Sequence, residues 1–326
     1  MNFNLMASVF RRGLIGLMTG GWLISCQPTA LSPETDADLR SIEHAMGTTQ
    51  IPVSPERVVV LDYAPLDAAL ALNVRPVGRA EALISPIYPE EVINEIPSVG
   101  RGSQPNLEMI LQLKPDLILG STVATDANYY RRLSRIAPTV LTKSNGRHGD
   151  WQEYFLLNAD ALGELENAEE LLVAYQQRVE ALKSELNQVP QHTKVSVVNR
   201  WSGGILAYTS SSFSGEVLQD IGFKRNPFQN TNDDYALKLS KEELAAIDGD
   251  VLFLTYNPDS EDSIARADFI SDPLWSTLNA VRQGVVCEVS NRVWLGGRSI
   301  LAANQILTDI ETCLESGDLE TVERVD

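Results

Sequence analysis

Short apolar runs alternate with helical patterns along most of this chain, which restricts it to folds built from β–α units. The apolar runs, each typical of a buried strand, lie at 58–61, 117–119, 195–198, 251–254 and 285–289. The helical patterns lie at about 64–72, 106–114, 127–136, 213–221, 240–247 and 298–314. Because strands that alternate with helices are joined by crossover connections, this order predicts parallel sheets of the α/β class.

One long helical pattern, at 167–189, divides the alternation into two halves. Asn167 is suited to cap this helix, and no Gly or Pro follows until Pro190. A helix of this length extends about 33 Å, so it can join two lobes rigidly. We therefore predict a first lobe at 47–166, a connecting helix at 167–189 and a second lobe at 190–326. An ordinary helix that covers a sheet is the alternative interpretation.

The composition excludes several classes of protein. With 326 residues, of which 44% are hydrophobic, the chain is long enough for two domains and too apolar to be disordered. Its 44 acidic against 26 basic residues, a net charge of −18, argue against a nucleic-acid-binding surface. Three His and three Cys leave little material for a metal cage. His44, His148 and His192 are isolated, and we expect His44 and His192 to be solvated.

The N-terminus has the layout of a secretory signal. Arg11 and Arg12 precede an apolar run at 13–24, which is too short to span a bilayer. The run leads into Leu-Ile-Ser-Cys26, which resembles the lipobox of bacterial lipoproteins. That resemblance implies cleavage before Cys26 and a diacylglycerol on its thiol. An ordinary signal peptide with an incidental Cys is the alternative.

Loss of the predicted signal peptide at 1–25 changes the charge of the remaining chain. This segment contains two Arg and no acid, so the net charge of −18 becomes −20. Residues 26–46 are expected to form a flexible tether, since they combine Pro, Ser, Thr and scattered charge. A lipid anchor on a tether predicts a protein held at a membrane outside the cytoplasm. Cys287 and Cys313 are then either a disulfide, as an oxidising compartment favours, or two buried free thiols.

The two halves of the chain echo each other around a matched pair of acids. In each half a capping residue precedes a Glu by two positions and an Asp follows that Glu by eight: Asn106, Glu108 and Asp116 in the first half, and Ser240, Glu242 and Asp250 in the second. The match predicts two lobes of similar build, each with a carboxylate on the first turn of an equivalent helix. Alternatively, the helix macrodipole alone favours acids at such positions, by about 0.3–1 kcal/mol.

No catalytic or nucleotide-binding motif is present, but cationic and aromatic residues follow the predicted strands. These residues are Arg79, Arg101, Arg200, Trp201, Tyr256, Trp294 and Arg298. In open α/β sheets, ligands bind outside the carboxyl ends of the strands. Arg binds carboxylate, catecholate or hydroxamate oxygens, and aromatic rings supply an apolar wall. The pattern therefore predicts a site for a bulky, negatively charged ligand, although solvated Arg and half-buried Trp residues are the alternative at each position.

Several stretches together resemble the periplasmic substrate-binding lipoproteins of iron-siderophore, heme and cobalamin ABC importers. The stretches are His44-Ala-Met-Gly-Thr-Thr-Gln-Ile-Pro, Pro55-Glu-Arg-Val-Val-Val-Leu61, Leu72-Asn-Val-Arg-Pro-Val-Gly78, Pro105-Asn-Leu-Glu-Met-Ile-Leu-Gln-Leu-Lys-Pro-Asp-Leu-Ile-Leu119 and the Leu162-Gly163 entry to the long helix. The resemblance implies a bilobal α/β periplasmic binding protein fold whose two lobes are joined by a single long helix. It also implies that Glu108 and Glu242 dock against an ABC permease.

The resemblance further implies a monomeric binding protein without cofactor or catalytic residues, whose partners are the permease, its ATPase and the membrane. The ligand would be a ferric siderophore of the citrate or hydroxamate type, with the iron held by the chelator and not by the protein. Cobalamin or heme binding is the first alternative. A periplasmic enzyme that processes siderophores is the second, and it would require a nucleophile–base pair or a cofactor loop.

Overall fold

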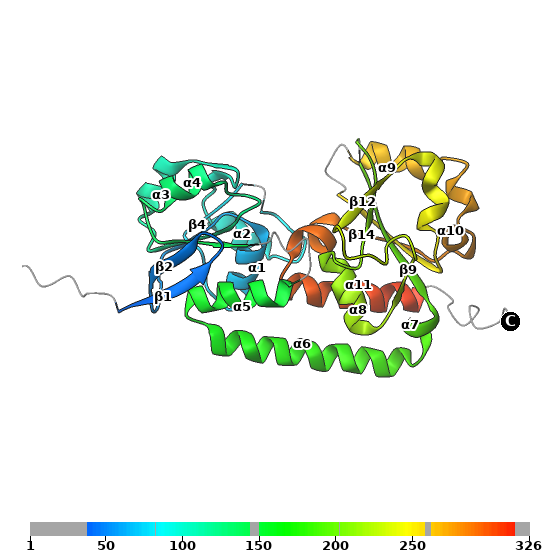
Figure 1. Ribbon diagram of the computed structural model, residues 1–326, viewed down its shortest axis with the longest axis horizontal. Coiled ribbons are helices and arrows are strands. Elements are labelled where there is room, and N and C mark those ends of the chain that lie inside the picture. Colours follow the sequence, from blue (N-terminus) through cyan, green and yellow to red (C-terminus); the bar gives the residue numbers. More distant parts are fainter. Residues whose placement is uncertain (1–37, 82, 144–149, 202, 258–261, 317–326) are drawn as a thin grey trace, which may run out of the picture. The chain divides into compact units, whose positions relative to one another are not determined.

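Two α/β lobes and a long helix between them make up the described part of the chain (Figure 1). The computed structural model describes residues 38–81, 83–143, 150–201, 203–257 and 262–316. The predicted signal peptide at 1–25, Cys26 and His148 lie outside these residues. The predicted α/β bilobal class is confirmed.

The first lobe is built on a parallel sheet with the strand order β4–β3–β7–β8. Its strands are β3 (Val58–Val60), β4 (Gly78–Arg79), β7 (Leu117–Ser121) and β8 (Thr139–Thr142). Its helices are α1 (Tyr63–Ala71), α2 (Glu90–Glu95), α3 (Leu107–Leu113), α4 (Ala127–Leu133) and α5 (Trp151–Leu162). Strands β3 and β7 are buried at every position, as expected for parallel strands covered by helices on both faces.

One hairpin precedes this sheet, and a second lies in the chain between strands β4 and β7. The first overlaps the segment that was predicted to be a tether. The hairpins are β1 (Leu39–His44) with β2 (Gly47–Pro52), and β5 (Gly100–Arg101) with β6 (Gln104–Pro105). Strand β1 thus lies inside the 26–46 segment, and Ile42 and Ile51 bury their side chains in the core of the lobe. A period-2 pattern this short is easily taken for a loop.

His44 was expected to be solvated, and that expectation is wrong. The imidazole is buried at 9% exposure, with Nε2 2.8 Å from Thr49 Oγ1 and Nδ1 accepting the amide of Leu141 at 3.2 Å. Burial lowers the pKa of His44, because the charged form would lose its water. His44 therefore fastens the hairpin to β8 as a neutral ring.

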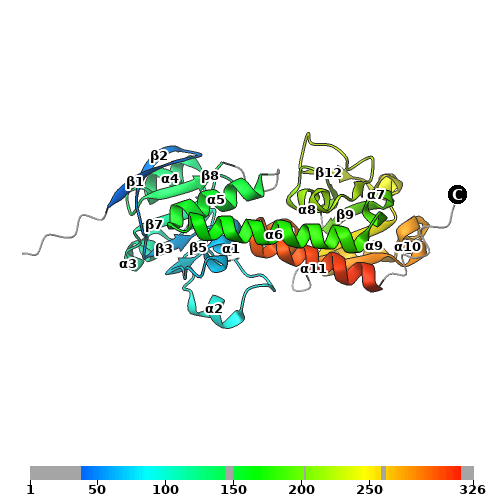
Figure 2. The same cartoon turned by 90° about the horizontal axis from the view of Figure 1, so that it is seen from below.

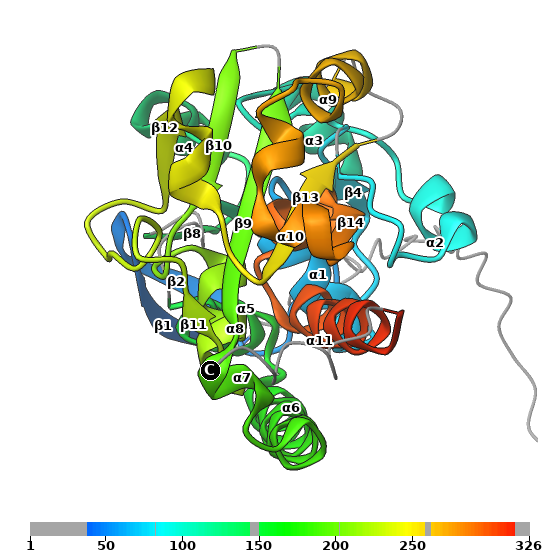
Figure 3. The same ribbon diagram turned by 90° about the vertical axis from the view of Figure 1, so that its right-hand side faces the viewer.

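The second lobe has a mixed sheet, where a purely parallel one was predicted. Figure 3 shows its strand order, β12–β10–β9–β13–β14, with β11 also paired to β9. Its strands are β9 (Lys194–Trp201), β10 (Gly204–Tyr208), β11 (Lys224–Arg225), β12 (Ala236–Leu239), β13 (Val251–Tyr256) and β14 (Val286–Ser290). Strands β10 and β12 are antiparallel, and Gly204, at φ +141°, turns the chain back after β9.

Helices and single turns cover this second sheet. They are α7 (Val189–His192), α8 (Phe213–Ile221), η1 (Lys241–Ile247), α9 (Asp262–Ile270), η2 (Trp275–Thr277), α10 (Asn279–Gln283), η3 (Arg292–Gly297) and α11 (Ile300–Ser316). The predicted helix at 240–247 is the 3₁₀ helix η1, and η3 is a π-helical segment. Because π-helical turns are rare and frequently occur at functional sites, η3 is a candidate part of a functional site.

Helix α6 (Leu165–Leu186) connects the lobes and packs against α5 and α11 (Figure 2). It begins before Asn167, because Gly163 ends α5 at φ +78° and the chain turns directly into the new helix. It ends before the predicted residue 189, because Asn187 lies in the left-handed region at φ +52°. The boundaries thus differ by a few residues from the pattern at 167–189.

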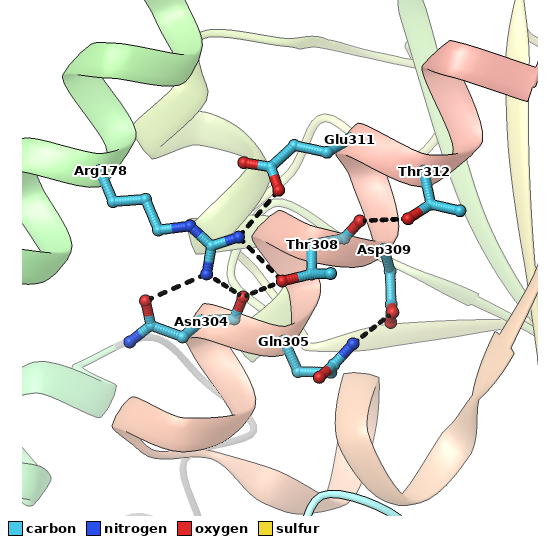
Figure 4. A network of polar contacts seen from close by, with 7 residues as sticks. All are labelled: Arg178, Asn304, Gln305, Thr308, Asp309, Glu311 and Thr312. Atoms are coloured by element: carbon cyan, nitrogen blue, oxygen red, sulfur yellow. Dashed lines mark hydrogen bonds and ion pairs between the residues drawn. The ribbon is translucent and has the colours of Figure 1, made fainter.

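Helix α11 is tied to α6 by one arginine (Figure 4). Arg178 donates to the carbonyl of Asn304 and to Thr308 Oγ1, each at 2.8 Å, and pairs with Glu311 at 2.9 Å. Near its C-terminal end α11 is also joined to β14 by a disulfide between Cys287 and Cys313, whose Cα atoms lie 5.9 Å apart. The connecting helix and the second lobe are therefore fastened together through α11.

Candidate ligand-binding site

An aromatic pocket lies at the carboxyl end of β9 in the second lobe. It has a volume of about 390 Å³ and is lined by Asn199, Trp201, Leu206, Tyr208, Phe213, Tyr235, Asn291, Trp294, Leu295 and Gly296. Five of these residues are aromatic, and the last four belong to η3 or immediately precede it. Rigid rings around a small hollow offer apolar contact area with little loss of conformational entropy, and the Tyr and Asn groups add hydrogen-bonding capacity.

Trp201 and Arg200 were predicted to act together, but they lie on opposite faces of the sheet. Trp201 lines the aromatic pocket and keeps 38% of its surface exposed. Arg200 lines a separate hollow of about 450 Å³ with Lys238 and Lys241, and donates to the carbonyl of Gly204 at 2.9 Å. Successive residues of a strand point to opposite faces, so adjacency in sequence separates these two side chains.

The predicted arginines of the first lobe differ in their surroundings. Arg79 is buried, and its guanidinium donates to the carbonyls of Ile93, Ala80 and Glu81 at 3.1–3.2 Å. Burial lowers the pKa of Arg79. Its hydrogen bonds shape the loop that leads to α2. Arg101 is exposed in the β5–β6 hairpin, where its charge faces solvent.

Two other predicted contact residues are built into the core. Trp294 borders the aromatic pocket, but it has no exposed surface, stacks 4.4 Å from the ring of Phe253 and donates to Asp309 at 2.7 Å. Arg298 is 5% exposed and forms an ion pair with Asp62 at 2.6 Å. Both side chains follow the last strand, as the sequence suggested. The interior of the protein supplies partners for them that the pattern could not reveal.

Tyr256 belongs to a second, larger pocket of about 800 Å³, which we call the α2 pocket. It is lined from the first lobe by Ile84, Ser85, Pro86, Tyr88, Pro89, Glu90, Ile93 and Asn94, and from the second by Tyr256, Asn257, Glu288, Val289, Ser290 and Arg292. Arg266 lies 5.0 Å over the Tyr256 ring and pairs with Glu288. Tyr256 thus stands at the rim of a pocket to which both lobes contribute.

Sequence reasoning missed several pocket residues, although one signal was available. Asn291 and Arg292 follow β14 directly and line the two pockets, so the rule applied to the other strand ends would have found them. Tyr208 and Tyr235 face each other with ring centroids 6.4 Å apart. They flank β10 and β12, the antiparallel strands that the alternating pattern did not predict.

The matched acids Glu108 and Glu242 are both exposed on the first turn of their helices. Asn106 caps α3 by accepting the amides of Glu108 and Met109, each at 3.1 Å. Ser240 begins η1 with a capping box. Met109 and Leu111 beside the first acid are 39% and 59% exposed. Each lobe therefore presents a carboxylate at the surface of an equivalent helix.

The described residues show neither a metal cage nor a membrane-spanning helix. No group of three or more His, Cys, Asp or Glu side chains in these ranges is arranged to hold a metal ion. None of the helices in the described part of the chain is both long and apolar enough to cross a bilayer.

Comparison with known proteins identifies the family. Residues 58–293 match the periplasmic binding protein family. The chain belongs to this family. As a periplasmic binding protein, it is a member of a non-enzymatic class of binding proteins.

This periplasmic binding protein aligns with its relatives over most of its own length and of theirs. The probable siderophore-binding lipoprotein YfiY of Bacillus subtilis is 35% identical, over 88% of this chain and 91% of that protein. The Fe(3+)-citrate-binding protein YfmC of the same species is 32% identical, over 84% and 85%. The crystal structure of Staphylococcus aureus SirA complexed with staphyloferrin B is 31% identical with a TM-score of 0.75, covering 85% of this chain and 98% of that one.

Proposed function

We propose that this protein is an extracytoplasmic lipoprotein that binds a ferric siderophore and delivers it to an ABC importer. The family, and relatives named for siderophore or ferric citrate binding, support this function. The aromatic pocket with the open indole of Trp201 is the observation that carries it, because this surface suits the apolar flank of a bulky chelate. Iron stays within the chelator and is cargo, not a cofactor.

The ligand class that we propose is a ferric chelate of citrate type that carries negative charge. Two relatives of at least 30% identity are named for ferric citrate, YfmC and Escherichia coli FecB. The exposed Arg101 is the predicted cation whose charge is open to a ligand, whereas Arg200 lies on the face of the sheet away from the aromatic pocket. Arginine binds carboxylate oxygens through paired N–H groups, which suits a citrate-type chelate better than a neutral one.

Delivery requires a membrane anchor and a docking surface. Cys26, at the end of the lipobox-like tetrad, is the proposed lipid attachment site, and relatives named as lipoproteins support it. Glu108 and Glu242 are the proposed contacts with the permease, one on each lobe. Their exposure and the apolar Met109 and Leu111 beside the first suit a protein interface.

Tryptophan fluorescence tests the proposed site directly. Trp201 and Trp294 line the aromatic pocket, whereas Trp151 and Trp275 do not, so a chelate there should quench Trp201 and Trp294. Titration with ferric citrate or ferric schizokinen should quench the wild type at micromolar ligand. Trp201→Phe should reduce this response, whereas Trp275→Phe, which changes a residue outside the aromatic pocket, should retain it. No quenching of the wild type by either chelate would exclude the proposal.

Cobalamin and heme are the competing cargoes within the same importer class. Each has its own absorbance spectrum, so the spectrum of protein purified from its native host separates them from a ferric chelate. A Soret band or a corrin spectrum would replace the ferric siderophore with the corresponding cargo.

A further inference from the structure

The first turn of α11, a helix of the second lobe, is capped by a carboxylate of the first lobe. Asp67 lies on α1 and is fully buried. Its two oxygens accept the backbone amides of Leu301 and Ala302 at 2.9 and 3.1 Å. The first amides of a helix have no partner within the helix, and an acid placed there satisfies them and is favoured by the helix macrodipole.

The opposite arrangement occurs at the start of α5, a helix of the first lobe. Glu216 lies on α8 of the second lobe and accepts the amide of Asp150 at 2.9 Å and that of Trp151. The side chain of Asp150, at the N-cap position, makes no capping hydrogen bond of its own. The first turn of α5 therefore obtains its cap from the other lobe.

Apolar packing surrounds the second of these caps. Trp151 packs edge-on against Tyr175 of α6, with centroids 5.1 Å apart, and against Phe213 of α8 at 6.0 Å. Trp151 itself is 1% exposed. Tight packing on three helices holds the amides of α5 at hydrogen-bonding distance from Glu216, so the contact depends on how the lobes are placed.

We propose that Asp67 and Glu216 are positioning residues that set the placement of the two lobes by capping a helix of the opposite lobe. Each cap fixes two backbone amides of one lobe to a side chain of the other. The pair acts at two separate points, α1 with α11 and α8 with α5, which restrains rotation as well as separation. Their effect on ligand affinity, through the pocket to which both lobes contribute, rests on the function proposed above.

The carboxyl groups of Asp67 and Glu216 both change their ionisation near neutral pH. Burial raises the pKa of Asp67 to about 7 and that of Glu216 to about 7. Around Asp67 lie Tyr88, whose hydroxyl is 3.4 Å away, and Tyr63 and Arg298, whose charges act on Tyr88. The charges of Asp150 and Asp220 act on Glu216, which in turn acts on Tyr175; Arg178 acts on Tyr175 and Lys183 on Asp220. Separated lobes would hydrate the carboxylates, so ionisation favours separation and protonation favours the capped junction.

Amide hydrogen exchange in the ligand-free protein tests the caps independently of cargo. Asp67→Ala should raise exchange at Leu301 and Ala302, and Glu216→Ala at Asp150 and Trp151, by about 5- to 30-fold, because alanine removes the acceptor oxygens altogether. In each case the change is in the lobe that was not mutated. Asp126→Ala is the matched control, because Asp126 caps α4 within its own lobe by accepting the amides of Asn128 and Tyr129 at 2.8 Å.

A second readout separates positioning from general stability. The radius of gyration from small-angle scattering, and the dissociation constant for ferric citrate, should change in Asp67→Ala and Glu216→Ala and stay at the wild-type value in Asp126→Ala. An equal change in all three variants would reduce the caps to ordinary structural contacts. Wild-type protein that fails to bind ferric citrate would remove the affinity readout and the proposed ligand, but not the exchange result.

If the variants do not fold, the wild-type protein itself provides the test. Its protection factors at the four capped amides, corrected for intrinsic exchange, should fall as the pH rises from about 6 to about 8. Those at Asn128 and Tyr129 should not follow the same curve. Protection that is independent of pH at the cross-lobe amides would overturn the proposal.

Discussion

A guanidinium nitrogen of Arg298 lies 2.6 Å from a carboxylate oxygen of Asp62, although 236 positions separate the two residues in the chain. The two side chains are only 6% and 8% exposed. Asp62 also caps α1 through the amide of Tyr63 and accepts the hydroxyl of Ser121. An arginine that the sequence suggested as a ligand contact is thus half of a buried pair that joins β3 of the first lobe to the end of η3.

Arg298→Gln should destabilise the protein by about 3–5 kcal/mol, because it leaves the Asp62 carboxylate buried without its counter-charge. Urea unfolding followed by tyrosine and tryptophan fluorescence measures the change. Arg75→Gln serves as the control, since the Arg75–Glu95 pair is more than half exposed on both sides and should contribute at most about 1 kcal/mol. Equal losses in the two variants would contradict the role assigned to the buried pair.

The stability contributed by His44 should depend on pH. Its folded pKa is lowered below the ordinary value of 6.5, so in acid the unfolded chain binds a proton that the folded protein does not. Stability is therefore present above that value and is lost as the pH falls through the window below it. The decrease in unfolding free energy from about pH 7 to about pH 5.5 should be smaller in His44→Gln than in the wild type. An identical pH dependence in both proteins would show that His44 is not the titrating group.

Removal of the disulfide should destabilise the second lobe without abolishing its fold. Cys287 and Cys313 are 26 positions apart, and closing a loop of that size is worth about 3 kcal/mol in the chain-entropy account. The double variant with Ser at both positions and the wild type in reductant should show the same lowered unfolding midpoint. A midpoint in reductant equal to that in oxidising buffer would mean that the bond adds nothing to stability.

Charge reversal at the docking acids should separate transport from binding. Glu108→Lys and Glu242→Lys should each reduce uptake of ferric citrate by cells, while the purified variants keep the wild-type dissociation constant. Glu169→Lys, at an exposed position on α6, is the matched control and should leave uptake intact. Loss of binding in either docking variant would place these acids in the ligand site instead of the permease interface.

Local residue preferences and the periodicity of apolar residues in the sequence were sufficient to predict much of the fold. The apolar runs at 117–119 and 251–254 fall within β7 and β13, and Gly163 ends a helix in the left-handed conformation as its position suggested. The echo around the matched acids also has a structural counterpart. Asp116 accepts the amides of Glu56 and Arg57 just before β3, and Asp250 accepts the amide of Lys194 at the start of β9. The spacing repeats because in each lobe the Asp directly precedes one strand and accepts an amide at the start of the neighbouring strand.

Partners that lie far apart in the chain could not be predicted in the same way. Nothing near Arg298 in the sequence indicates Asp62, and nothing near Trp294 indicates Phe253. The antiparallel strands β10 and β12 escaped detection because they are short, with five and four residues, and β12 carries the exposed Lys238. Residue type and position after a strand therefore locate a candidate site, while tertiary packing decides which of its side chains are open to a ligand.

Helix α11 is the last described element of the chain, yet two carboxylates near the beginning use its first turn and Arg298, two residues before it, as partners. Asp62 obtains its counter-charge, and Asp67 the amides of Leu301 and Ala302, only when residues 298–302 have been synthesised. A buried carboxylate without partners is costly, so the first lobe cannot complete its packing on a nascent chain that stops earlier. The final packing of the first lobe thus waits for residues 298–302 of the second, so the two lobes complete their folding together.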